Sequence, residues 1–548
     1  MKPKVSNKYT LILGILLLAA GWKAVLAALG AFPFNSDEAV VALMARHILQ
    51  GERPVFFYGQ SYMGSLDAYL IAAGFWLLGE QVWVIRLVQG LLYTGLIGTT
   101  IWLGKEALGS LEKGILAGGL LIFPTVNMTL YTTVTLGGYV ESLIAGNLIL
   151  VAAVRIAQIL DDQPGEAHQF PFWLWNLAFG IICGLGLWIL GLTVVYMIPA
   201  AIFLVWKNFR RAARTRSWSI SIYSGMLWVL GAVVGSTPWW IYALTHGFTR
   251  LIGELAGSAV SVEQGTWIAR IVQHFANFGL LGLTVLTGLR PPWEVRWLAL
   301  PLAPFVLAIW FGVGIWAVRR VLRKGQAASR SRLLIGVCLV LVIAFLVTPF
   351  GVDPSGRYFL PLGVIFSLIA ADCLLEIRIK QSGWKFAAAA LLVVFNIAGT
   401  VQCALANPPG ITTQFNPETQ VDHRYDAELA RFLLSEGETR GYTDYWVSYP
   451  LAFLSQEQLI YIPALPYHAD LRYTSRDDRY PAYDRMVAGS SRVAYITAGH
   501  PLLDALLRKS LRQNGVAWEE KTIGDFRVFY HLSWKATPQS LSISDLFQ

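Results

Sequence analysis

Charged residues are scarce in this chain of 548 residues. They account for 14% of the sequence, hydrophobic residues account for 55%, and the mean hydropathy is +0.51. A soluble enzyme or a disordered chain needs far more polar surface than this composition supplies. The balance therefore indicates a polytopic membrane protein.

Cysteine is equally rare, and the signatures of several common chemistries are missing. Cys183, Cys338, Cys373 and Cys403 all lie in apolar runs, so neither a disulfide framework nor a zinc motif is predicted. The sequence has no GxxxxGK[ST] phosphate loop, no HExxH, no GxSxG and no Asp-x-Asp pair. These absences argue against an ATP-driven pump and against a soluble transferase that uses nucleotide sugars.

Apolar runs recur through the first 400 residues instead. A bilayer core needs about 20 apolar residues per helix, and we predict about eleven spans. The fifth and sixth are either two short helices or one bent helix. The predicted spans are 10–31, 82–104, 114–127, 140–159, 172–189, 190–206, 218–242, 295–318, 333–350, 359–377 and 386–404.

The distribution of charge predicts the topology. Before residue 405 the chain has 29 Lys and Arg against 17 Asp and Glu, and after it 14 against 17. With a cytoplasmic N-terminus, every strongly basic cluster falls on the cytoplasmic side: MKPKVSNK, the 105–113 turn, 207–216, 319–332 and 376–385. The basic balance then reflects topology and anionic membrane lipid, and no nucleic acid partner is expected. The N-terminal run is too long for a simple signal peptide, so it is predicted to remain as the first span.

The chain changes character after NPPG (407–410), a cluster of helix breakers. The stretches 426–437 and 500–515 read as helices, whereas QLIYIPAL, RVAYITAG and FRVFYHL read as strands. We predict an all-α membrane bundle over 1–404 and a small extracytoplasmic α/β domain over 405–548. The aromatic stretch GYTDYWVSYPLAF is either an acceptor platform or ordinary core of this domain.

The loop after the first span begins FPFNSDEAV and carries two adjacent acids, Asp37 and Glu38. One interpretation is local: Asn35 or Ser36 caps a helix, Glu38 completes a capping box, and both acids suit the positive helix end. The other is functional, because acids at a membrane surface beside a helical bundle are candidates for chemistry.

Three stretches together resemble a known family. They are the Asp-Glu loop with its sequel GERPVFFYGQSYMGSLDAYLIAAGFWLLG and Arg86, the later YTTVTLGGYVESLIAG, and DPSGRYFLPL. They are similar to the polytopic glycosyltransferases of the GT-C superfamily, of the family 39 type that includes protein O-mannosyltransferases and lipid A aminoarabinose transferases. The resemblance implies a GT-C bundle whose first outer loop, 32–81, is catalytic. It also implies transfer of a sugar from a polyprenyl-phosphate donor to a lipid, protein or polysaccharide acceptor outside the cytoplasmic membrane.

This resemblance assigns roles that match the chemistry of the side chains. Asp37 is the expected base for the acceptor hydroxyl in a single inverting displacement. Glu38 either orients it, binds an acceptor hydroxyl, helps to hold a metal or only stabilises the helix end. Arg357 is expected to grip the donor phosphate, with Tyr358 and Arg86 as further candidates. A guanidinium anchored at the interface and aromatics of the membrane belt are the structural alternatives.

Other polar residues are candidates for binding substrate. Tyr58, Gln60, Tyr62 and Asp67 cluster in the first loop, and Glu141 follows Gly137 and Gly138 at the start of the fourth predicted span. Aromatics at the interface and an acid at a helix end are the alternatives. His246 and His274 fall in the predicted outer loop 243–294, where a divalent metal is an option and an ordinary surface histidine is favoured.

The rival functional class is a polytopic transporter or lipid flippase without transfer chemistry. Transporters show paired hydrophobic halves with helices interrupted at the membrane midplane. No such pairing is visible in this sequence, and the candidate ionisable residues collect at one side of the predicted membrane. The enzyme is therefore the favoured prediction.

Overall fold

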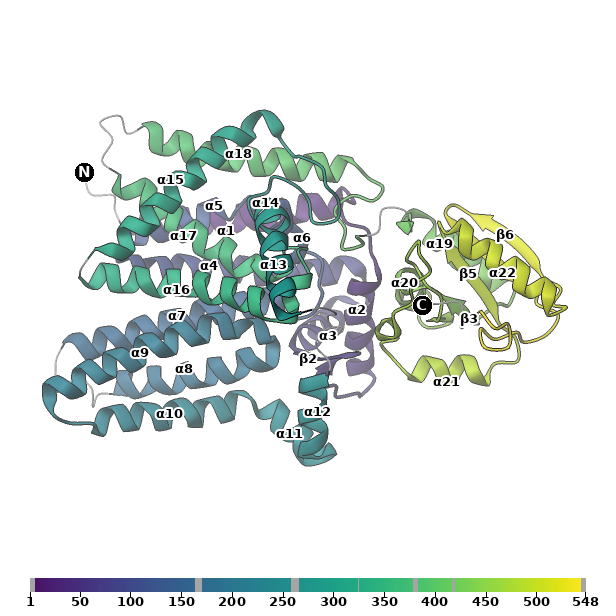
Figure 1. The fold of residues 1–548 in the computed structure, drawn as a ribbon, viewed down its shortest axis with the longest axis horizontal. Coiled ribbons are helices and arrows are strands. Elements are labelled where there is room, and N and C mark those ends of the chain that lie inside the picture. The colour runs from purple at the N-terminus through teal and green to yellow at the C-terminus, as the bar shows by residue number, and fades with distance from the viewer. Residues whose placement is uncertain are drawn as a thin grey trace.

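The computed structural model describes residues 5–162, 170–257, 266–323, 325–377, 383–415 and 419–543. The predicted basic segments 1–8, 319–332 and 376–385 fall partly outside these residues. Figure 1 shows an elongated molecule in which a bundle of helices is joined to a smaller domain of helices and strands. We call the end of the bundle that meets this domain the domain end, and the opposite end the basic end.

Ten helices of the described residues are long and apolar enough to cross a membrane, and the bent pair α10 and α11 makes an eleventh. The prediction of a polytopic bundle with about eleven spans is confirmed. In order along the chain, nine of the ten are built on α1 (Val5–Ala28), α4 (Val82–Leu108), α7 (Tyr139–Asp162), α8 (Phe170–Ile189), α9 (Val194–Thr215), α15 (Ala303–Leu322), α16 (Gln326–Val347), α17 (Leu360–Glu376) and α18 (Gly383–Leu405), and the tenth is the stretch Trp267–Leu286. In the bent pair, α10 covers Ser219–Gly235.

Two segments differ from the prediction. The predicted third span, 114–127, is divided into α5 (Leu111–Leu120) and α6 (Val126–Tyr131), with Pro124 between them, and neither half alone is long enough to span. The predicted loop 243–294 is largely helical. Its stretch Trp267–Leu286 is long enough to cross a membrane. Its mean hydropathy of 1.2 is the lowest among the ten candidates, which explains why the sequence analysis did not predict it as a span.

The remaining helices of this region are short. They are α11 (Thr237–His246), α12 (Phe248–Gly257), α13 (Trp267–Ala276) and α14 (Leu283–Leu286). Helix α13 packs at the C-terminal end of α16, where His274 Nδ1 lies 2.9 Å from the carbonyl oxygen of Leu346. The fifth and sixth predicted spans are two separate helices, α8 and α9, joined by a short turn at Gly191–Thr193.

The first loop folds over the domain end of the bundle. It contains α2 (Ser36–Leu49), the hairpin of β1 (Phe56–Phe57) and β2 (Gln60–Gly64), and α3 (Leu66–Leu78). Helix α2 packs on α3 on one side and on α20 of the C-terminal domain on the other. Twelve of its fourteen residues are buried, so this helix is the seam between the two parts of the molecule.

The C-terminal domain is built on a five-stranded sheet in the order β4-β3-β5-β7-β6. Strand β3 pairs in parallel with β4 and β5, whereas β7 pairs antiparallel with β5 and β6, and the predicted α/β class is confirmed. The elements are α19 (Asp426–Ser435), β3 (Arg440–Thr443), α20 (Tyr445–Leu454), β4 (Ile460–Pro463), α21 (Ala482–Gly489), β5 (Ala494–Ala498), α22 (Pro501–Gln513), β6 (Glu519–Ile523) and β7 (Phe526–Tyr530).

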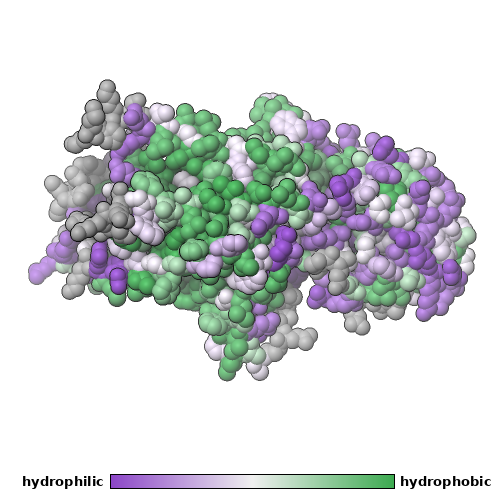
Figure 2. Space-filling view, turned by 90° about the horizontal axis from the view of Figure 1, so that it is seen from above, coloured by the Kyte–Doolittle hydropathy of each residue, from purple (hydrophilic) through white to green (hydrophobic). Residues whose placement is uncertain are grey.

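The surface divides in the same way as the fold. Figure 2 shows hydrophobic side chains over much of the helical part and mainly hydrophilic ones over the C-terminal domain. Large apolar side chains such as Leu244, Phe311 and Leu322 are more than 70% exposed on the bundle. This exposure fits helices whose outer faces contact lipid tails.

Candidate functional site

Helix α2 presents Asp37 in its first turn, facing the C-terminal domain. The carboxylate accepts a hydrogen bond of 2.8 Å from the hydroxyl of Tyr445, at the start of α20. The neighbouring Ser36 hydroxyl donates to the backbone carbonyl of Tyr445. The Asn35 side chain caps nothing, because it donates to Thr413 Oγ1 at 2.8 Å. The alternative of a simple capping box is therefore wrong, since each of these side chains is committed to another segment.

Glu38 forms a buried ion pair with Arg86 on α4. The Arg86 Nε and Nη2 atoms donate to the two carboxylate oxygens at 2.8 and 2.7 Å, and Glu38 has no solvent exposure. Arg86 also donates to the carbonyl oxygens of Phe32 and Pro33 at 3.3 and 3.4 Å. The pair therefore ties the start of α2 and the preceding loop to a membrane helix. The predicted roles of Glu38 in catalysis and of Arg86 at the donor phosphate stay predictions.

Arg357 is presented by a turn that several contacts fix. The Asp353 carboxylate accepts a hydrogen bond from the backbone amide of Ser355 at 2.8 Å and forms an ion pair with Arg357 Nη2 at 2.6 Å. Gly356 has a φ of +91°, and a Cβ atom there would lie 2.6 Å from Asn127 Oδ1. Asn127 in turn donates to the Gly356 carbonyl oxygen at 3.1 Å. Only glycine fits this left-handed, crowded position, so the turn aims the guanidinium.

A ring of tyrosines surrounds this guanidinium. Tyr62, Tyr131, Tyr139 and Tyr358 all interact with it electrostatically, and its centre lies 5.1 Å from the Tyr358 ring. Tyr131 is also within electrostatic range of Asp37. The Tyr131 side chain thus interacts electrostatically with both Asp37 and Arg357, which are 320 residues apart in sequence. The Nε atom of Arg357 is buried and has no hydrogen-bond partner among the described residues, so one donor is free.

An apolar groove of about 300 Å³ ends at this region. It runs between α9 and α16, and Tyr62 and Tyr358 stand at its end. The apolar residues that line it are Leu190, Leu192, Val194, Val195, Ile198, Val340, Leu341, Ala344, Phe345 and Phe350. A molecule with an apolar chain and an anionic head would fit with its head near Arg357.

The C-terminal domain adds two polar side chains that the sequence did not single out. Tyr445 bonds to Asp37, and the guanidinium of Arg479 lies 5.5 Å from the Tyr445 ring centre. With its amide oriented to satisfy its neighbours, Gln60 accepts hydrogen bonds from Arg479 at 2.8 and 3.0 Å. Nearby, burial raises the pKa of Asp477 to about 7, and the charge of Asp37 adds to this shift while Arg479 opposes it.

The other predicted acids lie together behind the first loop. Asp67 and Glu141 are both buried and their carboxyl groups interact directly. Asp67 also accepts hydrogen bonds from Gln89 at 2.7 Å and from the Thr135 hydroxyl. Asp67 and Glu141 thus form a buried acidic pair. It braces the 132–138 loop, and the contacts described for it do not reach Asp37.

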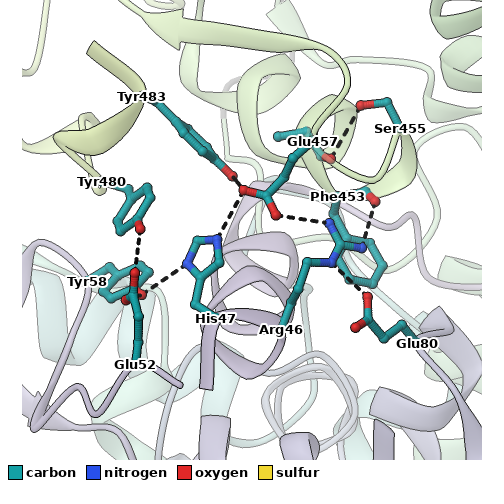
Figure 3. Close-up of polar contacts among 11 residues, drawn as sticks. Arg46, His47, Glu52, Tyr58, Glu80, Phe453, Ser455, Glu457, Tyr480 and Tyr483 are labelled. Atoms are coloured by element: carbon teal, nitrogen blue, oxygen red, sulfur yellow. Dashed lines mark hydrogen bonds and ion pairs between the residues drawn. The ribbon is translucent and has the colours of Figure 1, made fainter. Parts of the chain in front are cut away.

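Tyr58 belongs to a polar network between the two parts of the molecule, as Figure 3 shows. Its hydroxyl donates to Glu52 at 2.5 Å and lies 3.0 Å from His47 Nδ1. The other nitrogen of His47 lies 3.1 Å from Glu457 in the C-terminal domain. None of the contacts described for Tyr58 involves Asp37 or Arg357, and its role in binding substrate stays a prediction.

The same network holds Arg46 of α2. Its Nε donates to Glu80 at 2.7 Å, and its Nη2 donates to the Phe453 carbonyl oxygen at 3.1 Å. The side chains of Figure 3 therefore come from α2, from the first loop and from the C-terminal domain. They fix the angle at which α2 meets α20, and with it the contact between Asp37 and Tyr445.

The histidines of the predicted 243–294 loop do not form a metal site. His246 stacks on Tyr242 with ring centres 4.4 Å apart, and His274 is buried against the end of α16. Across the residues that the structure describes, no three His, Cys, Asp or Glu side chains gather as metal ligands. Whether the reaction uses a divalent metal stays a prediction.

Comparison with known proteins identifies the fold. No protein-family model and no curated protein matches the chain. The structure of ArnT from Cupriavidus metallidurans bound to undecaprenyl phosphate matches with a TM-score of 0.59 at 13% identity, over 98% of this chain and 100% of that one. This chain has the GT-C fold. The apo form of the same ArnT matches with a TM-score of 0.55 at 12% identity, over 93% of this chain and 98% of that one.

A second GT-C protein extends the likeness. The oligosaccharyltransferase of Archaeoglobus fulgidus in its apo form matches with a TM-score of 0.51 at 12% identity, over 90% of this chain and 70% of that chain. The predicted resemblance to GT-C glycosyltransferases is confirmed for the fold. At these identities the comparisons carry no site residue across, so the roles of Asp37, Glu38, Arg357 and the others rest on the contacts described above.

Sequence reasoning missed Tyr445 and Arg479 for a physical reason. They lie 408 and 442 residues after Asp37, in a domain whose placement no local pattern encodes. The stretch GYTDYWVSYPLAF did carry a signal, because it is unusually aromatic for a small α/β domain. The structure shows that this stretch forms β3 and α20, and that α20 packs on α2.

Proposed function

We propose that this protein is a membrane glycosyltransferase that moves a sugar from a polyprenyl-phosphate donor to an acceptor hydroxyl at the domain end of the bundle. The observation that carries the proposal is the apolar groove of about 300 Å³ whose lining includes Tyr358, because the guanidinium of Arg357, with its unpaired buried Nε donor, lies 5.1 Å from the centre of that ring. An apolar channel that leads to a fixed cation suits a long lipid with a phosphate head. The GT-C fold, which ArnT also has with undecaprenyl phosphate bound, supports the same donor class.

The reaction follows from the positions of two groups. The acceptor hydroxyl oxygen attacks the anomeric carbon, the bond from that carbon to the phosphate oxygen breaks, and the lipid phosphate leaves with the electron pair. Asp37 takes the hydroxyl proton, which in comparable enzymes contributes about 10²- to 10⁴-fold to the rate. Arg357 stabilises the charge that develops on the leaving phosphate. One base without a separate nucleophile implies a single displacement with inversion, which product analysis by NMR tests.

The other site residues support these two. Tyr358 and Tyr62 line the end of the groove, where they bound the space for the donor head. Tyr445 holds Asp37 through its hydroxyl, while Gln60 holds Arg479 at the C-terminal domain. Glu38 and Arg86 position the first turn of α2, and Asp67 with Glu141 braces the adjoining loop. The acceptor, whether lipid, protein or polysaccharide, approaches from the side of the C-terminal domain in this proposal.

The location belongs to the proposal as well. Since the basic clusters gather at the end of the bundle away from the C-terminal domain, we place that end and the N-terminus in the cytoplasm. The C-terminal domain and Asp37 then face the outside of the cytoplasmic membrane. Reactivity of a single introduced surface cysteine toward a membrane-impermeant reagent in intact cells tests this orientation, with Lys535→Cys in the C-terminal domain compared with Lys105→Cys at the basic end.

The deciding experiment measures transfer of radiolabelled sugar from a panel of polyprenyl-phosphate donors in membranes that contain the wild type or one variant. Asp37→Asn is expected to lower transfer at least about a hundredfold, and Arg357→Gln by about 10²- to 10³-fold. Asp470→Asn, on an exposed carboxylate, and Arg319→Gln, on the opposite end of the bundle, are the matched controls. Full activity of Asp37→Asn, or label that crosses the membrane without transfer, would refute the proposal in favour of a transporter.

A further inference from the structure

A second hollow lies at the basic end of the bundle, far from the groove end that meets Arg357. It has a volume of about 810 Å³ and is lined by the C-terminal turns of α9, the first turns of α16 and the end of α7. In Figure 1 these helix ends lie on the side away from the C-terminal domain. No step of the proposed transfer reaction uses this hollow.

The lining of this hollow is strongly cationic. Lys207, Arg210, Arg214 and Arg332 face it with a single acid, Asp161. Asp161 pairs with Lys207 at 2.5 Å, so the three arginines are left without an acidic partner in the lining. Among the lining residues that the structure describes, four cations therefore stand against one acid. Charge of this density in a concave site attracts an anion.

Aromatic and carbonyl contacts hold two of these arginines in place. The Arg210 guanidinium lies 4.1 Å from the ring centre of Trp206. Arg332 donates to the backbone carbonyl oxygens of Val321 and Arg323 at 3.1 and 2.8 Å, at the end of α15. The hollow is therefore a formed site on three helices rather than a run of freely moving side chains.

An apolar groove continues from the hollow along the same two helices. Its volume is about 440 Å³, and it shares Trp206, Ser329 and Arg332 with the hollow. Its remaining lining is almost entirely apolar: Pro199, Ile202, Phe203, Leu333, Gly336, Leu339 and Val340. The cationic hollow thus opens directly into a strip that suits an acyl chain.

Basic residues at the ends of membrane helices are common, and alone they indicate only topology. The joined groove goes further, because a cationic pocket beside an apolar strip matches the two parts of a phospholipid. We propose that the hollow binds an anionic phospholipid of the leaflet at the basic end, with its phosphate head among Arg210, Arg214 and Arg332 and an acyl chain between α9 and α16. This inference does not depend on the proposed transfer reaction.

The test uses the purified full-length protein in a neutral detergent. Binding of phosphatidylglycerol and of phosphatidylcholine with the same acyl chains is measured by native mass spectrometry, for the wild type and for Arg210→Gln/Arg214→Gln. Each cation near a headgroup contributes about fivefold to affinity, so the double variant should bind phosphatidylglycerol roughly 25-fold more weakly. The wild type should prefer phosphatidylglycerol, and the variant should lose this preference.

Matched variants make the outcome decisive. Lys105→Gln/Arg216→Gln removes the same charge from the same end outside the hollow, and it should bind as the wild type does. Ile202→Asn places a polar group in the groove and should weaken the binding of phosphatidylglycerol. Equal binding of both lipids, equal losses in the two double variants, or displacement of the lipid by millimolar inorganic phosphate would each overturn the proposal.

Discussion

The buried pair of Glu38 and Arg86 yields a prediction that separates a positioning role from a catalytic one. In the variant Glu38→Gln the carboxylate becomes a neutral amide of the same shape, and the Arg86 charge stays buried. Removing one partner of a buried ion pair typically costs about 3 to 5 kcal/mol, because the remaining charge is uncompensated. Arg86 keeps its long bonds to the Phe32 and Pro33 carbonyl oxygens, at 3.3 and 3.4 Å, and can donate to the one amide oxygen of the new side chain, but no negative charge balances it.

We therefore expect Glu38→Gln to lose about 3 kcal/mol of stability. The double variant Glu38→Gln/Arg86→Met should regain most of that loss, since it removes the unpaired charge as well. The control is the exposed pair of Lys8 and Glu112, joined at 3.1 Å, where Glu112 is 66% exposed. Surface pairs contribute about 0 to 1 kcal/mol, so Glu112→Gln should unfold almost as the wild type does.

The assay compares thermal unfolding of the purified variants with their sugar transfer at a temperature where all of them are folded. If Glu38 acts by positioning α2, the double variant should regain transfer along with stability. The reasoning is refuted if Glu38→Gln unfolds as the wild type does while transfer is lost, or if the double variant is stable and still inactive. Either result would show that the Glu38 carboxylate contacts the substrate.

Three further predictions follow from single contacts. Tyr445→Phe removes the hydroxyl that donates to Asp37 at 2.8 Å, and a hydrogen bond to a charged group contributes about 1.5 to 3 kcal/mol, so transfer should fall about 10- to 100-fold. An unaltered rate in the folded variant would contradict this role of Tyr445. Asp477 has a pKa of about 7 in the folded protein and an ordinary value of 3.8, so between these pH values the unfolded state loses its proton first and the free energy of unfolding should fall as pH rises. Asp477→Asn should flatten this slope in thermal unfolding measured from pH 4 to 8. An identical slope would refute this reasoning. Gly356→Ala puts a Cβ atom 2.6 Å from Asn127 at a φ of +91°, so it should cost more than about 1 kcal/mol of folding stability and lower the affinity for the donor. The control Gly225→Ala, in open space on α10, should cost no stability.

The sequence predicts the membrane bundle well because apolar length is a local property. Hydropathy located α1, α4 and α7 to within a few residues, and helix breakers marked the end of α18. It failed at Trp267–Leu286, whose polar residues dilute the apolar signal, and at α5, which Pro124 shortens. Both failures have local causes, which an average of hydropathy over a window of residues does not separate.

The candidate site shows the same division. Asp37 and Arg357 were found from their positions beside predicted spans. The partner of Glu38 was not, because Arg86 lies 48 residues later and was itself a candidate for the donor phosphate. Tyr445 and Arg479 come from another domain altogether. Residue types suggested which side chains do chemistry, whereas the pairing among them became visible only in three dimensions.

The seam at α2 has a consequence for how the protein is assembled. This helix is synthesised early, yet Asp37 can accept the hydrogen bond from the Tyr445 hydroxyl only after the last quarter of the chain has been synthesised and has folded against α2. A nascent chain that stops near residue 405 would carry the lipid groove and Arg357 but an undocked Asp37. Under the proposed function, transfer would then depend on the C-terminal domain having folded against α2.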